Sequence, residues 1–392
     1  MALTIAERSV LDKIDEDQLV ELTRSLLRAA GQNPPGEEAA TVAVLAATAT
    51  ELGLGVCETP VWPGRNNIRI TLTGGPGPGL LLLGHTDVVP VGEGWNKDPF
   101  GGVVEDDRIY GRGASDMKGG LAASLSAMAA LRGAGLNGPV ELAALVDEEE
   151  TGIGISAYIE SALRPFLGCI TAEPTDLQTV VGARGASYLR VEIRGTACHA
   201  GKPEDGANAI YGAADVVAEI ERMHRDLALR PHPLLGAATW SVGQINGGTS
   251  GSIVPAECVL VADRRLLPGE SAAAVLDDVR ERVAGLRLNE RGLDVDVTMP
   301  MEMPAFETPA DSPLAATVDA ALADAGGPGL PPGGWTAACD GGFVARYLGV
   351  PVVVLGPGSV STQAHRPDES VAIEELVIAA RAYALSALRL LG

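Results

Sequence analysis

The stretch Leu80-Leu-Leu-Leu-Gly-His85-Thr-Asp87 joins four consecutive leucines to a histidine and an aspartate. A short, wholly apolar run of this kind is typical of a strand that is buried on both faces, as in a parallel sheet covered by helices. Further runs of the same character lie at 68–72, 140–146 and 352–355. Segments with helical spacing of apolar residues surround them, at 15–32, 37–53, 118–133, 153–163 and 372–391. This alternation predicts an α/β fold with a mostly parallel mixed sheet.

The region 183–300 has a different pattern. Its residues predict four strands and two helices, in the chain order strand 186–194, helix 206–227, strand 238–246, strand 257–265, helix 270–285 and strand 293–299. This βαββαβ order is that of a ferredoxin-like module. Because the α/β pattern lies on both sides of it, we expect an inserted domain at 183–300 and a larger domain formed by 1–182 and 301–392.

The composition is that of an acidic globular protein. In 392 residues, 29 lysines and arginines stand against 51 aspartates and glutamates, which gives a formal charge of −22. Nucleic acids and anionic membranes bind basic surfaces, so we expect neither as a partner. The five cysteines are odd in number and scattered, and no apolar run approaches the ~20 residues of a membrane span. Acidic residues near the N-terminus disfavour a signal peptide, and we expect a cytoplasmic protein.

Residues that can bind metal follow several of the expected strands. His85 and Asp87 are two positions apart, so they share a face of an extended chain, where the carboxylate can orient the imidazole. Glu173 and His365 also follow strands. In open α/β sheets, ligands bind beyond the carboxyl ends of the strands. For His85 alone, the ordinary alternative is a histidine that is simply hydrogen-bonded at a strand end.

Acidic residues also lie at two other ends of expected elements, at Asp116 and at residues 147–150. Asp116 lies in the glycine-rich stretch 111–120, just before an expected helix, where it could cap the helix or bind an ion. Residues 147–150 are four consecutive acids after an apolar strand, so either they face water or a cation lies among them. Two histidines and several acids at the ends of α/β elements together indicate a hydrolytic metal centre.

Other catalytic schemes fit the sequence less well. The chain contains neither a G-x-S-x-G nucleophile elbow nor a P-loop. Cys198 and His199 are neighbours on what we expect to be a strand, so their side chains would point to opposite faces and form no thiolate–imidazole pair.

The motifs occur in a specific order along the chain. They are H-x-D at 85–87, G-R-G-x-x-D-M-K-G-G at 111–120, D-E-E at 147–149, E-P-T at 173–175 and A-H-x-P-D-E at 364–369. In this order the chain resembles, from about residue 15 to residue 390, the family of two-metal hydrolases that includes acetylornithine deacetylase, succinyl-diaminopimelate desuccinylase, the aminoacylases and carboxypeptidase G. The resemblance implies a catalytic metal-binding domain with an inserted lid and dimerisation domain.

The resemblance also implies two divalent metal ions per subunit, with zinc as the first expectation and cobalt or manganese as alternatives. His85, Asp116 and Glu173 would hold one ion. Asp116, Glu149 and His365 would hold the other, so that Asp116 bridges the two.

The remaining catalytic roles follow from the same resemblance. Glu148 would be the general base, and Asp87 would orient His85. A shift of one residue would instead make Glu149 the base and Glu150 the ligand, but the Thr-Gly-Ile-Gly that follows favours the first assignment. His199 corresponds to the lid histidine that in this family reaches the active site of the partner subunit, so we expect a homodimer formed through the inserted domain.

Two arginines are candidates for substrate binding. Arg184 and Arg265 stand where relatives anchor a substrate carboxylate, a task that suits a bidentate guanidinium, although either could be a surface ion pair. Ser252 replaces an asparagine that many relatives carry. We expect a small N-acylated amino acid, cleaved at its amide bond; a peptide cleaved by a carboxypeptidase or dipeptidase is the first alternative, and a non-catalytic metal- or ligand-binding paralogue is the second.

Overall fold

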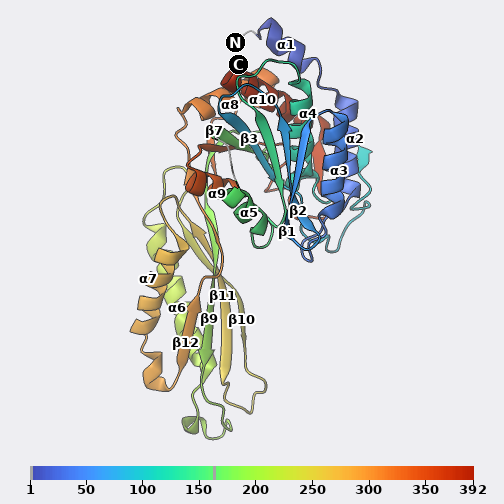
Figure 1. The fold of residues 1–392 in the computed structure, drawn as a ribbon. Helices are drawn as coiled ribbons and strands as arrows, with labels where there is room; N and C mark the ends of the chain where they lie inside the picture. The colour runs from blue at the N-terminus through green and yellow to red at the C-terminus, as the bar shows by residue number, and fades with distance from the viewer. Residues whose placement is uncertain (1–2, 162–164) are drawn as a thin grey trace. The chain divides into compact units, whose positions relative to one another are not determined.

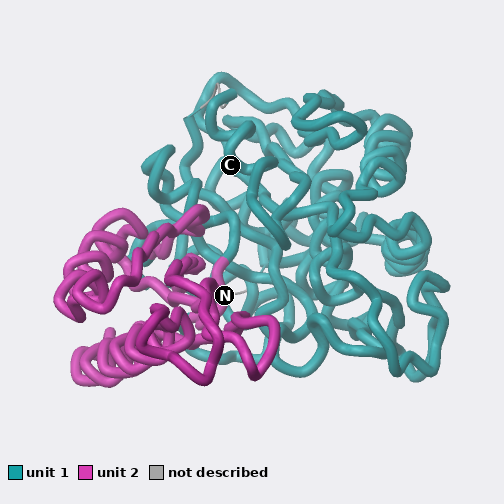
Figure 2. The backbone as a smooth tube through the Cα atoms, turned by 90° about the horizontal axis from the view of Figure 1, so that it is seen from below, with its two compact units in different colours: residues 1–182, 307–334, 339–392 teal, residues 183–306, 335–338 magenta. Residues whose placement is uncertain are grey.

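The structure is a computed structural model that describes residues 3–161 and 165–392. The chain forms two compact units (Figure 2). Unit 1 comprises residues 1–182, 307–334 and 339–392, and unit 2 comprises residues 183–306 and 335–338. In sequence, unit 2 therefore interrupts unit 1.

Unit 1 is built around a mixed sheet (Figure 1). Within the described residues this sheet has nine strands, in the order β1 (Gly55–Trp62), β2 (Arg65–Leu72), β6 (Val140–Leu145), β3 (Gly79–His85), β7 (Phe166–Thr171), β16 (Val352–Val354), β8 (Val180–Ala183) and β14 (Phe306–Glu307), with β15 (Gly333–Trp335) paired to β8. Strand β3 runs parallel to β6 and β7, and β16 runs parallel to β7. The predicted α/β class with a mostly parallel central sheet is confirmed.

The central strands are the core of unit 1. All seven residues of β3 are buried, and Leu80, Leu81, Leu82 and Leu83 are at most 1% exposed. Strand β6 is buried in the same way. Helices cover both faces of the sheet and exclude water from it, so side chains on both faces of these strands are buried and mostly apolar.

The helices of unit 1 are α1 (Ile5–Leu11), α2 (Glu16–Arg28), α3 (Ala39–Glu51), α4 (Gly119–Ala130), α5 (Ile153–Ser161), α8 (Pro313–Ala325), α9 (Gly341–Phe343) and α10 (Ile373–Leu391). Helix α4 consists mainly of glycine, alanine, serine and leucine, and it is buried almost all round because it packs against both β3 and α10. No helix in the described part of the chain combines the length and apolarity that a membrane span requires.

A small antiparallel sheet of unit 1 joins distant parts of the chain. Its strands are β4 (Val103–Glu105), β5 (Arg108–Tyr110) and β17 (Ser370–Ala372). Ser370 pairs with Tyr110 in this sheet. The segment before α4 is thereby held beside the segment before α10.

Unit 2 has the predicted βαββαβ order. Its elements are β9 (Gly185–Arg194), α6 (Ala209–Ala228), β10 (Thr239–Gly247), β11 (Glu257–Leu266), α7 (Ala272–Gly285) and β12 (Asp294–Thr298), and the short β13 (Glu302–Met303) pairs with β9. The sheet order is β10-β11-β9-β12, with antiparallel neighbours. Alternate residues of β9, among them Leu189, Val191 and Ile193, are buried in the core of this unit.

Candidate metal centre

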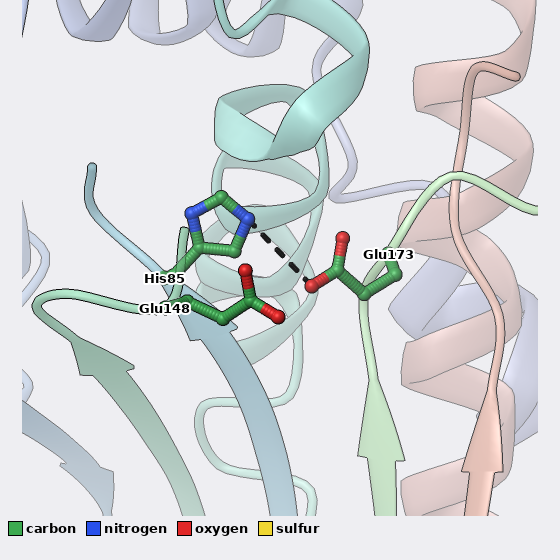
Figure 3. A group of neighbouring side chains, drawn as sticks. All are labelled: His85, Glu148 and Glu173. Atoms are coloured by element: carbon green, nitrogen blue, oxygen red, sulfur yellow. Dashed lines mark ion pairs between the residues drawn. The ribbon is translucent and has the colours of Figure 1, made fainter. Parts of the chain in front are cut away.

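Three neighbouring parallel strands of unit 1 carry potential metal ligands where they end (Figure 3). His85 is the last residue of β3, Glu148 follows the end of β6, and Glu173 follows the end of β7. One ligand atom from each of these side chains lies within 4.8 Å of the others. The distance from Nε2 of His85 to Oε1 of Glu173 is 3.6 Å. The parallel strands therefore bring an imidazole and two carboxylates together at one edge of the sheet.

Asp116 lies between two imidazoles. Its Oδ1 is 3.1 Å from Nε2 of His85, and its Oδ2 is 3.3 Å from Nε2 of His365. Nε2 of His365 is also 3.2 Å from Oε1 of Glu149. His85, Asp116 and Glu149 form a second group with ligand atoms within 4.8 Å of one another. A single carboxylate thus contacts both histidines, one with each of its oxygens.

Asp87 orients both His85 and the segment that follows β6. Its backbone carbonyl accepts a hydrogen bond from Nδ1 of His85 at 2.9 Å. Because a carbonyl can only accept, Nδ1 carries a proton and Nε2 is the nitrogen that faces Asp116. The carboxylate of Asp87 accepts hydrogen bonds from the backbone N–H groups of Glu148 and Glu149, each at 3.2 Å. The predicted orienting group was the carboxylate of Asp87, but its Oδ1 lies 3.5 Å from Nδ1 of His85, and the 2.9 Å hydrogen bond is made by the backbone carbonyl instead.

The four consecutive acids at 147–150 have different environments. Asp147 has a positive φ of 68°, and its carboxylate lies 2.9 Å from both the Arg65 guanidinium and Nδ2 of Asn33. Glu148 belongs to the group with His85 and Glu173, and Glu149 belongs to the group with His85 and Asp116. Glu150 is exposed and belongs to neither group. This division favours Glu148 as the base and Glu149 as the ligand over the alternative in which Glu149 is the base and Glu150 the ligand.

Negative charge is concentrated in this buried space. Burial and neighbouring carboxylates raise the pKa of Glu173 and of Glu148 well above the usual range. Hydrogen bonds to Asp116 and Glu149 raise the pKa of His365 to about 10. Burial alone would raise the pKa of Asp116, but the imidazoles of His365 and His85 hold it well below its ordinary value.

The donor set fits divalent metal ions. Carboxylate oxygens and imidazole nitrogens are the ligands that Zn²⁺, Co²⁺ and Mn²⁺ accept, and a divalent cation would offset the excess of negative charge. The part of the chain that the structure describes offers two overlapping groups of such ligands. The geometry can therefore support metal-assisted hydrolysis.

Two residues that support the site were not predicted from the sequence. Asn33 donates from Nδ2 to both Asp87 and Asp147, at 2.9 Å each. Glu369 accepts a hydrogen bond from the backbone N–H of Asp116 at 3.0 Å. The prolines after Asn33 indicate only a break between helices, and they say nothing about the partners of its amide. For Glu369, the available signal was its place in the A-H-x-P-D-E motif.

The other predicted site residues belong to unit 2. His199 is exposed, and its Nδ1 accepts a hydrogen bond from the backbone N–H of Gly201 at 3.0 Å. The prediction that Cys198 and His199 lie on a strand is wrong, because β9 ends at Arg194. The chain leaves the sheet there, and His199 forms only an isolated bridge with Ile253.

The two arginines predicted to bind substrate are partly buried in unit 2. Arg184 donates from Nε to the carbonyl of Leu235 at 2.9 Å. Arg265 pairs through Nε with Asp263 at 3.0 Å. Burial and the nearby charge of Arg265 lower the pKa of Arg184. Ser252, the residue that departs from the usual asparagine, lies with its Oγ 3.1 Å from that of Ser250.

Comparison with known proteins gives a family match over most of the chain. The model of peptidase family M20/M25/M40 matches residues 81–389. An acetylornithine deacetylase from Salmonella arizonae is 32% identical over 337 residues, which cover 84% of this chain and 85% of that protein. An acetylornithine deacetylase from Proteus mirabilis is 31% identical over 80% of this chain and 79% of its own length.

Solved structures show the same fold. A metallo-carboxypeptidase of the M20 family from Sulfolobus solfataricus aligns with a TM-score of 0.79 at 20% identity, covering 96% of this chain and all of its own (100%). A dinuclear metal-binding peptidase of the M20 family from Bacillus subtilis aligns with a TM-score of 0.74 at 17% identity, covering 96% of this chain and 98% of its own.

Proposed function

Because the chain belongs to peptidase family M20/M25/M40, and is therefore a metal-dependent amidohydrolase, we propose that it removes the acyl group from a small N-acylated amino acid. The observation that carries the proposed centre is the carboxylate of Asp116, which contacts His85 with one oxygen and His365 with the other. The choice of an N-acyl amino acid is supported by similarity to acetylornithine deacetylases at 31–32% identity.

Two divalent metal ions would be held by these side chains. We assign His85, Asp116 and Glu173 to one ion and Asp116, Glu149 and His365 to the other, with zinc as the first expectation and cobalt or manganese as alternatives. When bound, such ions lower the pKa of water and polarise an amide carbonyl. Asp87 keeps Nε2 of His85 turned toward the centre, through the hydrogen bond to Nδ1.

Glu148 is the proposed general base. Its carboxylate lies beside His85 and Glu173, and its backbone is held by Asp87. Burial, together with the carboxylates of Glu173 and Glu149, raises the pKa of Glu148, so its carboxylate holds a proton more strongly than that of an exposed glutamate. In the reaction, Oε of Glu148 would take a proton from the attacking water and later deliver it to the nitrogen of the leaving amine.

Unit 2 would supply the remaining functions. We propose that Arg184 and Arg265 bind the substrate carboxylate and that His199 donates a hydrogen bond to the developing oxyanion. Strand β10 pairs only with β11 among the described residues, and most of its side chains are exposed. Its free edge is the proposed contact through which two chains form a homodimer. The five cysteines form no disulfide, which supports a cytoplasmic location.

A panel of substrates tests the proposed function. Metal-reconstituted protein is assayed with N-acetyl amino acids, N-succinyl amino acids and dipeptides. We expect the highest kcat/KM with an N-acyl amino acid. A clear preference for dipeptides would replace deacylation by dipeptidase activity, and the absence of hydrolysis with every class would contradict the proposal.

A further inference from the structure

The carboxylate of Glu369 is a buried acceptor for four donors of one segment. Glu369 is 1% exposed. Its Oε1 accepts from the backbone N–H groups of Ser115 and Asp116, at 2.9 and 3.0 Å. Its Oε2 accepts from the backbone N–H of Gly113 at 3.1 Å and from the Arg112 guanidinium at 2.6 Å. All four donors lie between residues 112 and 116 of the glycine-rich stretch 111–120.

The stretch has an irregular backbone, in which Arg112, Ala114 and Lys118 donate their N–H groups to backbone carbonyls, while the N–H groups of Gly113, Ser115 and Asp116 have Glu369 as their acceptor. Gly113 has a φ of +90°, and a Cβ there would lie 2.6 Å from Val88, so a larger residue has no room. Asp116 itself has non-helical dihedrals. Because these irregular turns leave backbone N–H groups without helical partners, the carboxylate of Glu369 supplies the acceptors that fix the backbone of Asp116.

The same glutamate also anchors the segment that carries His365. Its backbone carbonyl accepts a hydrogen bond from Gly111 at 2.8 Å. Its neighbour Ser370 donates its N–H to the side chain of Gln363 at 3.0 Å, which closes the loop containing His365. The segments of Asp116 and His365, far apart in sequence, are therefore joined at Glu369.

We propose that Glu369 is a positioning residue that holds Asp116 and His365 in register and thereby sets the affinity of the metal site they share with Glu149. This rests on the two-metal centre of the proposed function. The ion held by His85 and Glu173 depends on Glu369 only through Asp116. The ion held by Asp116, Glu149 and His365 has two of its three ligands on the segments that Glu369 joins, so it is the more sensitive of the two.

Zinc binding to the full-length protein tests the proposal. Chelated wild-type protein, Glu369→Gln and the control Glu374→Gln, which removes an exposed acid from the first turn of α10, are dialysed against increasing Zn²⁺, and bound zinc is counted. In the glutamine variant, an amide nitrogen would face the donors of Gly113 and Arg112 or those of Ser115 and Asp116. We expect two ions in wild-type protein and the control, and a second ion bound at least about tenfold more weakly in Glu369→Gln.

The outcomes are distinct. Two ions with wild-type affinities in Glu369→Gln would overturn the positioning role, while fewer than two in wild-type protein would overturn the two-metal centre itself. Equal weakening of both ions would also overturn the proposal. If circular dichroism shows that Glu369→Gln does not fold, zinc binding is measured with Glu369→Asp instead. Weaker binding of the second ion alone then supports the proposal. Unchanged affinity for both ions, or loss of the fold, overturns it. In the supporting case, kcat falls more than KM changes.

Discussion

Replacement of Glu148 by glutamine separates the general base from the metal ligands. The amide has nearly the same shape as the carboxylate, but it cannot accept the proton of the attacking water. The backbone N–H of Glu148 keeps its hydrogen bond to Asp87, so the segment should stay in place. Nothing in the metal assignments depends on this side chain. We therefore expect turnover to fall while both metal ions stay bound.

The expected fall in turnover of Glu148→Gln follows from the role of Glu148 as general base. General acid–base groups contribute about 10²–10⁴-fold to rate, which corresponds to about 3–5 kcal/mol in the activation barrier. The free energy of unfolding of the metal-free protein should not decrease, because burial and the carboxylates of Glu173 and Glu149 disfavour the charged form of Glu148. A neutral amide removes that repulsion. The midpoint of urea denaturation is expected to be unchanged or higher.

The assay compares three neighbouring variants. kcat and bound zinc are measured for Glu148→Gln, Glu149→Gln and the exposed control Glu150→Gln. Glu149→Gln weakens a contact with His365 that is 3.2 Å long, so it should lose one ion, whereas Glu150→Gln should behave as wild type. Loss of zinc from Glu148→Gln together with its retention by Glu149→Gln would contradict these assignments, because the base and the ligand would then lie one residue further along the chain.

Three further results are expected. Exhaustive chelation should abolish turnover, and Zn²⁺, Co²⁺ or Mn²⁺ should restore it; full activity of metal-free protein would contradict the mechanism. Asn33→Ala leaves two buried carboxylates without their shared donor, so urea denaturation should show a loss of about 1–3 kcal/mol in the free energy of unfolding, in contrast to the control Asn66→Ala, which removes an exposed hydrogen bond to Glu58. Mixed Glu148→Gln and His199→Ala subunits should regain activity, because one site per heterodimer has both residues; verified heterodimers without activity would show that His199 acts within its own chain or only supports the lid.

The fold could be predicted where the sequence has a long, unbroken apolar run. The leucines at 80–83 identify β3 because a strand covered on both faces requires an unbroken apolar run. Strand β1 was not predicted, since within the described residues it pairs with β2 alone and is largely exposed, so its sequence has no such run. Helix α8 and the small sheet containing β17 were missed as well. Their positions depend on packing partners that lie far away in the chain.

The candidate site divides in a similar way. The end of an apolar strand pointed to His85, the glycine-rich stretch before a helix pointed to Asp116, and the order of the motifs pointed to His365. The sequence could not show that one carboxylate lies between two imidazoles, since that contact depends on how β3 and the loop after β16 are brought together. The role of Asn33 was hidden for the same reason: its two acceptors lie on different loops.

The order of the strands in the chain has a consequence for biosynthesis. Strand β16 lies beside β7 in the sheet, yet it is made only after the whole of unit 2, and His365 follows it. A nascent chain that has just completed unit 2 already contains the acids of the centre but lacks the second imidazole and Glu369. The site that His365 would share with Asp116 and Glu149 can therefore be completed only when almost the entire polypeptide has been made, whereas His85, Asp116 and Glu173, proposed for the other ion, are all made before unit 2.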